Sequence, residues 1–489
     1  MNHRTLIIGG GATAVSALTQ LVRVPSVTSI TTIDPRPAGL GHAFGVTDPQ
    51  LLCNTSVDVT SLDPDGPSGL LRYLTERGWP VGPDDFVPRY LVGHYCREVY
   101  LRSRRDAERR GIAVDHRSAR ATAIRSRITG PGPDDREYTV ELDDGSRVTG
   151  TEVLVCLGLD RPRVPELVRE HLGRPSLLAQ PYPADRLRSL PGDGRALVLG
   201  SKLSAVDAAL VLCRRGVETV MASPSGRLPA VRTRLRRPER PFLDRRGWRR
   251  ASPGSPHLDL GLTRLLVSAI RKAGGRLPLR EQTSDALSAR QRLDDELALA
   301  AAGRVPWQDV VAEVIDAVNE WTAPWDASLR AEVLGRYREV MSRYISSIPQ
   351  RNARLLDEHM AAGRLRLAPG FPLEVRPEGA GWRVEWPDGR SERFTHLVCA
   401  TGFQPPQVDL AGPGRYRIGA PVHGDTAPEI TEDLRLRDAH RGGTERIWLL
   451  GAAAHQRTAI VNYLNAAAKH AKRVAAEIAA ETPRARSAA

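Results

Sequence analysis

Lysine, cysteine, aromatic residues and long apolar runs are all scarce in this chain of 489 residues. Its five cysteines form no C-x-x-C pair and no metal-ligand spacing, which argues against a zinc site and against a redox disulfide. A sparse set of reduced thiols is typical of a cytoplasmic protein. No stretch of about eighteen consecutive apolar residues occurs, so we expect no membrane-spanning helix.

The positive charge is large, and arginine supplies almost all of it. The net charge is +13, and only four of the 70 basic residues are lysine. A surplus of this size invites a nucleic-acid interpretation. The preference for arginine, together with abundant alanine, glycine and proline, instead indicates codon bias, so we expect no nucleic-acid partner. The densest cluster, residues 232–240, is expected to face solvent.

The strongest pattern lies in the first forty-odd residues: an apolar strand, a glycine-rich turn, a helical stretch and a second strand that ends in an acid. The turn fits G-x-G-x-x-A, and the pattern is formed by Gly9, Gly11, Ala14 and Asp34. Gly9 permits a tight turn, Gly11 lets the backbone approach a diphosphate, and Ala14 lets helix and strand pack closely. Asp34 can accept hydrogen bonds from ribose hydroxyls. This unit predicts a dinucleotide-binding domain.

A second unit of the same kind begins at residue 196, where an apolar strand ends in Gly200. We expect its helix to run from Ser204 to Arg215, with Ser204 as the N-cap. Arg227 follows the next strand, at the place where the 2′-phosphate of an NADP would lie. From residue 258 to residue 362, apolar residues recur at a spacing of three to four, which predicts helices.

Together these units predict an α/β protein with two Rossmann-like dinucleotide-binding domains, the first interrupted by the second, and a helical insert. Strand patterns return near residues 382, 396 and 447, and a last helix is expected over 459–480. The expected parts are the first part of the first nucleotide domain (1–165), the first part of the second (166–250), a helical insert or substrate cap (251–365), the return strands of the second domain (366–405), the C-terminal part of the first (406–480) and a disordered tail (481–489).

Several short motifs resemble those of a bacterial family of FAD/NAD(P)-binding proteins that is related to the flavin-dependent N-hydroxylating monooxygenases. They are the glycine fingerprint at 9–14, L-L-C-N at 51–54, F-x-P-R-x-x-x-G-x-Y at 86–95, G-S-K-L-S-A-V-D at 200–207, G-R-L-P at 226–229 and A-T-G at 400–402. The resemblance covers most of the chain, and it assigns the first nucleotide domain to FAD and the second to NADPH.

The resemblance implies a FAD-dependent, NADPH-using monooxygenase. Such an enzyme would N-hydroxylate a small amine or amino acid with O₂, through a flavin C4a-hydroperoxide, as in natural-product pathways. Two alternatives stay open. One is a flavin oxidase or dehydrogenase with a degenerate NADPH site, and the other is a flavin-binding protein without turnover.

The resemblance and the spacing together nominate two groups of residues. Asn54, in the L-L-C-N motif, and Asn465, on the last helix, are the candidate catalytic residues. The candidate cofactor-binding residues are Gly9, Gly11, Ala14, Asp34, Arg89, Gly200, Lys202, Ser204, Arg227, Thr401, Gly402 and Gly451. A turn-capping role is an equally good interpretation of Asn54. Arg89 could bind a phosphate or a carboxylate, or it could lie in solvent.

One position departs from the family pattern, because Lys202 stands where the second motif has glycine. Glycine at that place lets the backbone approach the diphosphate of NADPH, and a side chain crowds the approach. Either the lysine ammonium replaces the lost N–H contact as a point charge, or NADPH binding is weakened.

Overall fold

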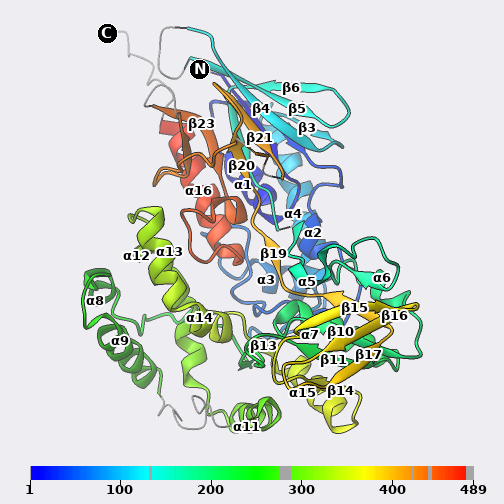
Figure 1. Cartoon of the computed structure of the whole chain (residues 1–489). Coiled ribbons are helices and arrows are strands. Elements are labelled where there is room, and N and C mark those ends of the chain that lie inside the picture. Colours follow the sequence, from blue (N-terminus) through cyan, green and yellow to red (C-terminus); the bar gives the residue numbers. More distant parts are fainter. Residues whose placement is uncertain are drawn as a thin grey trace, which may run out of the picture.

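Two parallel sheets with their helices, and a separate group of helices, make up the protein. The computed structural model describes residues 2–130, 135–159, 161–274, 288–420, 422–423, 425–438 and 443–480. In Figure 1 the first sheet lies at the top, the second sheet at the lower right and the insert helices at the lower left. None of the described helices is both long enough and apolar enough to cross a membrane.

The first sheet draws its strands from both ends of the chain. Its order is β22 (Arg435–Arg437), β23 (Thr444–Leu449), β7 (Glu152–Val155), β1 (His3–Ile8), β2 (Val27–Ile33) and β3 (Ala113–Arg117). All neighbours pair in parallel except β22 and β23, which pair antiparallel. Because Leu6, Ile7 and Ile8 of β1 are all buried, the end of this strand is a continuous apolar run rather than an alternating one.

Helices cover one face of the first sheet. They are α1 (Ala12–Leu21), α2 (Gly41–Phe44), α3 (Gly69–Thr75), α4 (Arg89–Arg109) and α16 (Leu464–Ala480). The first of them, α1, packs against both α4 and α16, and its Leu18 and Leu21 are fully buried. In α16 the side chains of Ala471, Val474 and Ile478 recur at helical spacing and enter the same core.

An antiparallel sheet covers the other face. Its order is β20 (Val408–Leu410), β21 (Arg415–Ile418), β4 (Ala121–Ile128), β5 (Arg136–Leu142) and β6 (Arg147–Gly150). Its apolar side chains pack on Leu6 and Ile8 of β1. Glu445 of β23 is fully buried beneath this sheet. Its carboxylate accepts hydrogen bonds from Tyr138 (2.8 Å) and Tyr416 (3.1 Å) and forms an ion pair with Arg136 (2.7 Å).

The second parallel sheet lies between the two halves of the first in the chain. Its order is β14 (Leu365–Leu367), β11 (Glu218–Ala222), β10 (Arg195–Leu199), β18 (His396–Cys399) and β9 (Leu177–Leu178). One face carries α6 (Asp185–Arg188), α7 (Leu203–Arg214) and α15 (Gln350–Ala361). The other face meets α5 (Glu166–Arg169) and a small antiparallel sheet of β15 (Glu374–Glu378), β16 (Gly381–Glu385) and β17 (Ser391–Phe394). A short pair, β8 (Arg161–Pro162) and β19 (Phe403–Gln404), joins the two connections between the sheets.

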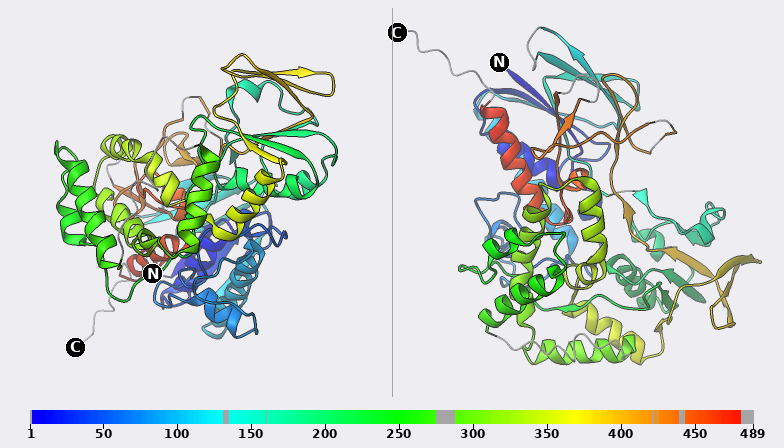
Figure 2. Two further views of the ribbon diagram at one scale, coloured as in Figure 1. Left: turned by 90° about the horizontal axis from the view of Figure 1, so that it is seen from below. Right: turned by 60° about the vertical axis from the view of Figure 1, so that its left-hand side comes forward.

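The insert is helical, as predicted, and packs around tryptophans, but it does not extend to residue 365, because α15 packs on the second sheet and β14 is a strand of that sheet. It contains α8 (Arg245–Arg250), α9 (Leu258–Lys272), α11 (Ala289–Ala301), η1 (Pro306–Val310), α12 (Val311–Thr322), α13 (Ala327–Arg336) and α14 (Arg338–Tyr344). Trp248, Trp307 and Trp321 lie in its core. A short parallel pair, β12 (Val231–Arg232) and β13 (Ile348–Pro349), ties both ends of the insert together. Figure 2 shows α12 and α13 beside the red α16 from another direction.

Several sequence expectations need correction. The last helix begins at Leu464 rather than at residue 459, and α7 begins with Lys202, not Ser204, as its N-cap. The arginines of residues 232–240 do not all face solvent, because Arg232 is fully buried and Arg237 is largely so. Neither antiparallel sheet was predicted as a sheet. The predicted disordered tail lies outside the described residues.

We expect Glu445→Ala to destabilise the fold by about 3 kcal/mol, because Arg136 and two tyrosine hydroxyls lose a buried partner. The thermal unfolding midpoint of the purified protein measures this. Glu166→Ala is the control, because its carboxylate is 80% exposed. An equal loss in both variants would contradict the assignment.

Candidate functional site

The first strand-to-helix turn is built from backbone alone. Gly9 has a φ of +113°, and a Cβ there would lie 2.6 Å from the carbonyl oxygen of Cys156, so only glycine fits. Gly11 is the N-cap of α1 and has no side chain to cap the helix. The next loop also approaches closely, since a Cβ on Gly41 would lie 2.9 Å from Gly11 Cα. The first N–H groups of α1 therefore end in a cradle that a side chain would fill, as a diphosphate site requires.

The acid at the end of β2 is held beside this turn. Asp34 is buried, and its Oδ2 accepts the N–H of Gly10 at 2.9 Å. Its Oδ1 accepts the backbone N–H of Arg36, also at 2.9 Å. The side chain of Arg36 donates to the same Oδ1 at 3.2 Å, so the bonds fix the carboxylate orientation and leave a lone pair on Oδ2 for a ribose hydroxyl. Gly9, Gly11, Ala14 and Asp34 are thus brought together, and they fit an adenosine diphosphate.

A segment from the C-terminal part of the chain closes the same turn. Gly451, at the start of η2 (Gly451–Ala454), packs on the first turn of α1, where a Cβ would lie 2.6 Å from Thr13 Oγ1. Its N–H donates to Nδ1 of His470 at 3.2 Å. Burial lowers the pKa of His470 to about 4, and Arg473 and Lys469 act in the same direction. The ring is therefore neutral near pH 7, and its Nε2 faces Thr458 Oγ1 at 3.4 Å. Sequence reasoning missed His470.

The two most specific motifs pair with each other. The N–H of Arg89 donates to the carbonyl of Leu51 at 2.8 Å, and the N–H of Cys53 donates to that of Val87 at 2.9 Å. Asn54 follows directly, and its carbonyl accepts from Arg232 Nη1 at 3.1 Å. Its side-chain amide makes no hydrogen bond to a described residue, so it is available to a ligand; its catalytic role stays a prediction.

Arg89 joins the two nucleotide domains. Its guanidinium pairs with Asp207 of α7 at 2.6 Å and donates to Tyr182 Oη at 2.9 Å and to the carbonyl of Leu52 at 3.2 Å. Burial alone would lower the pKa of Arg89, but the Asp207 carboxylate raises it above its ordinary value. The expected contact of Arg89 with a cofactor stays a prediction, and the structure places the charge against an internal carboxylate.

The second strand-to-helix turn repeats the design of the first. Gly200 has a φ of +136°, and a Cβ there would overlap the carbonyl oxygen of Ala400. Thr401 and Gly402 follow on the same strand end; Thr401 Oγ1 donates to the carbonyl of Arg163, and the N–H of Arg163 donates to that of Gly402 at 2.9 Å. The A-T-G motif therefore closes the second turn and holds the connection between the sheets.

Lys202 and Arg227 both reach the insert. The ammonium of Lys202 donates to Ser342 Oγ of α14 at 2.7 Å, and Arg227 pairs with Glu339 of the same helix at 2.8 Å. Burial lowers the pKa of Lys202, which Glu339 partly offsets. Ser204 lies half-buried in the first turn of α7 and does not cap it. Sequence reasoning missed Ser342 and Glu339, for which no motif gives a signal.

Asn465 is held by the arginine stretch. It is buried in the first turn of α16, and its Oδ1 accepts from Arg237 Nη2 at 2.9 Å. Arg237 also pairs with Asp316 of α12 at 3.1 Å. The side-chain oxygen of Asn465 is therefore engaged by Arg237, and the catalytic role of Asn465 stays a prediction.

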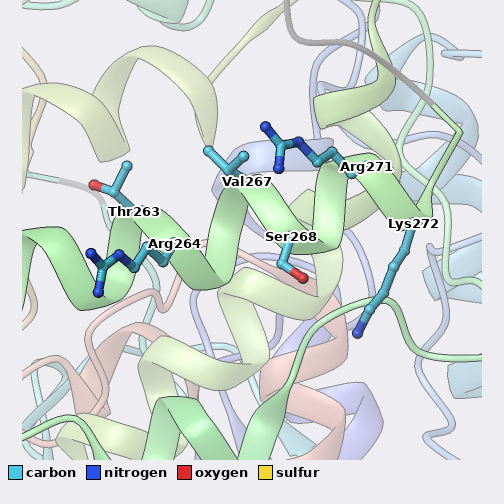
Figure 3. Close-up of a pocket in the computed structure, with 6 residues that line it drawn as sticks. All are labelled: Thr263, Arg264, Val267, Ser268, Arg271 and Lys272. Carbon is cyan, nitrogen blue, oxygen red and sulfur yellow. The ribbon is translucent and has the colours of Figure 1, made fainter.

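Two cavities differ sharply in their relation to these turns. One of about 540 Å³ is lined by six residues of a single helix, α9, and lies on neither nucleotide sheet (Figure 3). Another of about 350 Å³ lies at the carboxyl ends of β11 and β14, and its lining includes Ser225, Arg227, Arg292 and Glu296. The carboxyl ends of parallel strands are where open α/β sheets bind ligands, so the smaller cavity is the candidate nucleotide site.

The comparisons agree with this geometry. Residues 6–160 match the family described as FAD-NAD(P)-binding. The matched residues contain the Gly9–Gly11 turn and Asp34, and β22, β23 and α16 from the C-terminal part of the chain complete their sheet and its helical layer. The resemblance noted from the sequence motifs is confirmed for this part of the chain. Among curated proteins, no sequence matches significantly.

The whole fold is similar to solved structures. They include ornithine hydroxylase from Pseudomonas aeruginosa in its reduced form (13% identity, 98% of this chain and 99% of that one, TM-score 0.61). Ornithine N-hydroxylase from Kutzneria sp. 744, with reduced FAD, NADP⁺ and L-ornithine, is 16% identical over 98% of this chain and 99% of that one, with a TM-score of 0.58. The FAD-bound cadaverine monooxygenase from Erwinia amylovora is 14% identical over 98% of this chain and 94% of that one, with a TM-score of 0.55. These likenesses establish a shared fold and confirm the predicted fold class.

Because His470 is neutral in the folded protein, acid should weaken the fold. An unfolded histidine takes up a proton near pH 6.5, whereas the folded one does so only near pH 4, so stability is lost as pH falls between these values. The loss should reach about 1 to 2 kcal/mol by pH 5. Thermal midpoints of wild type and His470→Asn at pH 7 and pH 5 test this. The exposed His94→Asn is the control, and an equal acid sensitivity of all three would contradict the prediction.

Proposed function

We propose that this protein is a FAD-dependent, NADPH-using monooxygenase that N-hydroxylates a small amine or amino acid. The observation that carries the proposal is the cradle of backbone at Gly9 and Gly11, inside a fold shared over nearly its full length with amine and amino-acid hydroxylases. When bound, FAD would accept a hydride from NADPH and supply the chemistry that activates O₂.

The residues of the chain would bind FAD, orient the substrate and enclose the site. Gly9, Gly11, Ala14 and Asp34 would hold the adenosine diphosphate of FAD, with Gly451 closing the turn from the other side. The free amide of Asn54 would donate or accept at the flavin or the substrate. The insert, whose β12 neighbours Asn54 through Arg232, would exclude water and choose the substrate.

The NADPH site would use the second turn. Gly200 and the first N–H groups of α7 would meet the diphosphate, and Thr401 and Gly402 would border the path to the flavin. The cavity of about 350 Å³ would take the adenosine end, with Arg227 and Arg292 facing the phosphate on its ribose.

The purified protein should contain an equimolar amount of FAD, and Gly9→Ala should lose it, because the new Cβ meets Cys156 and moves the turn. The 450 nm absorbance per chain measures FAD content. Gly145→Ala is the matched control: Gly145 also has a positive φ, of +81°, but nothing lies within 4 Å of an added Cβ. A colourless wild-type protein that takes up no FAD would sink the proposal.

With FAD bound, a small amine or amino acid should stimulate NADPH oxidation in air, and the product should gain one oxygen by mass. L-Ornithine, L-lysine and cadaverine are the first substrates to test. The contact of Lys202 with Ser342 favours one rival, a flavin oxidase or dehydrogenase with a degenerate NADPH site. Anaerobic mixing separates the two, because NADPH should bleach the flavin of the monooxygenase and leave that of the rival oxidised.

A further inference from the structure

A single helix of the insert engages two of the cations at the second nucleotide site. Lys202, the N-cap of α7, donates to Ser342, and Arg227, five residues beyond β11, pairs with Glu339. Glu339 and Ser342 are three apart on α14, so they lie on neighbouring turns of one face. Figure 1 shows α14 between the other insert helices and the second sheet.

These cations stand where phosphates bind in such sheets. Lys202 borders the first N–H groups of α7, which have no side-chain cap, and Arg227 lines the cavity at the ends of β11 and β14. The Glu339 carboxylate and the Ser342 hydroxyl offer oxygens to the same two groups that phosphate oxygens would reach. A nucleotide and α14 therefore compete for them.

We propose that residues 338–342 form a displaceable cover on the second nucleotide site, which a nicotinamide dinucleotide phosphate moves aside by taking over Lys202 and Arg227. This inference rests on the proposed use of NADPH. It also resolves the departure at Lys202: the lysine holds the cover while the site is empty and meets a phosphate when the cover opens.

The far end of α14 is fixed, which gives the cover a hinge. Arg343 forms a buried ion pair with Glu296 of α11, and its carbonyl accepts the N–H of Ala230 at 3.0 Å. The carbonyls of Tyr344 and Ile345 accept from Arg232 at 2.7 and 3.1 Å. The preceding residues are more exposed, Glu339 at 65% and Val340 at 57%, and they are held to the insert by Met341, which packs on its core, and by Tyr337, which donates to Asp259 of α9.

The exchange favours the nucleotide. Both side chains of the Arg227–Glu339 pair are exposed, so the pair shifts the equilibrium toward the closed cover by no more than about fivefold. The hydroxyl of Ser342 is a neutral partner for an ammonium, and a phosphate oxygen makes the stronger, charge-assisted bond. The cover therefore lowers the affinity for the nucleotide without abolishing it.

Calorimetric titration of NADP⁺ into the FAD-loaded protein tests the cover. We expect Glu339→Gln and Ser342→Ala each to tighten binding about three- to fivefold, and the double variant more. Ser342→Ala changes no charge, so its effect does not come from reduced repulsion of the phosphates. Glu320→Gln, which removes the partner of Arg245 and Arg249 elsewhere in the insert, should leave binding unchanged.

Lys202→Ala should change the affinity for NADP⁺ in the opposite direction. It removes the ammonium that meets the phosphate, so NADP⁺ binding should weaken despite the loss of a contact to the cover. Tighter binding of Lys202→Ala would show that the side chain only crowds the site, and would overturn the exchange.

The opening itself can be followed without altering the cover contacts. All five native cysteines are buried, so spin labels at Val340→Cys and Leu373→Cys, two exposed positions, report the distance from the cover to the second domain. Saturating NADP⁺ should add a longer distance. An unchanged distance with NADP⁺ bound would overturn the cover and leave the monooxygenase proposal standing. Absence of NADP⁺ binding in every variant would overturn both the cover and the use of NADPH.

Discussion

Backbone contact at two strand-to-helix turns is the constraint on which the rest of this structure depends. Gly9 donates its N–H to the carbonyl of Ile33 at 2.8 Å and presses its side-chain-free face on Cys156, so one residue joins three neighbouring strands. Gly200 does the same in the second sheet, with Ala222 at 2.7 Å and Ala400. In each turn the glycine lies against a carbonyl just after the neighbouring strand, that of Cys156 or of Ala400. This contact fixes where the following helix begins and therefore where the first N–H groups of that helix point.

Arginine, so abundant here, works largely inside the protein. Arg89 joins the first domain to Asp207 of the second, Arg232 holds Asn54 and the end of α14, and Arg237 ties Asp316 to Asn465. A buried guanidinium must satisfy several donors, and its planar fork can reach carboxylates and carbonyls on different elements at once. The net positive charge is therefore a poor guide to binding partners, since some of the arginines that contribute to it form bonds inside the protein.

Lysine has a different place. Lys202 stands at the start of α7 with a hydroxyl as its partner, and burial lowers its pKa. A compact ammonium on a flexible stem can exchange one oxygen for another with little rearrangement, which a fork held on several sides cannot do. The second nucleotide site thus combines a rigid turn at Gly200 with a cation that can change partners.

The sequence alone determined the two strand–turn–helix units and the helical insert, because glycine spacing and apolar periodicity are local signals. It located Gly9, Gly11, Asp34 and Gly200 for the same reason. Only the tertiary structure decided where the long side chains go: that Arg89 meets Asp207, that Lys202 meets Ser342 and that His470 meets Gly451. These partners lie 19 to 140 residues apart in the chain, and an arginine or lysine can reach in many directions from one position. Packing, which no local pattern encodes, selects among those directions.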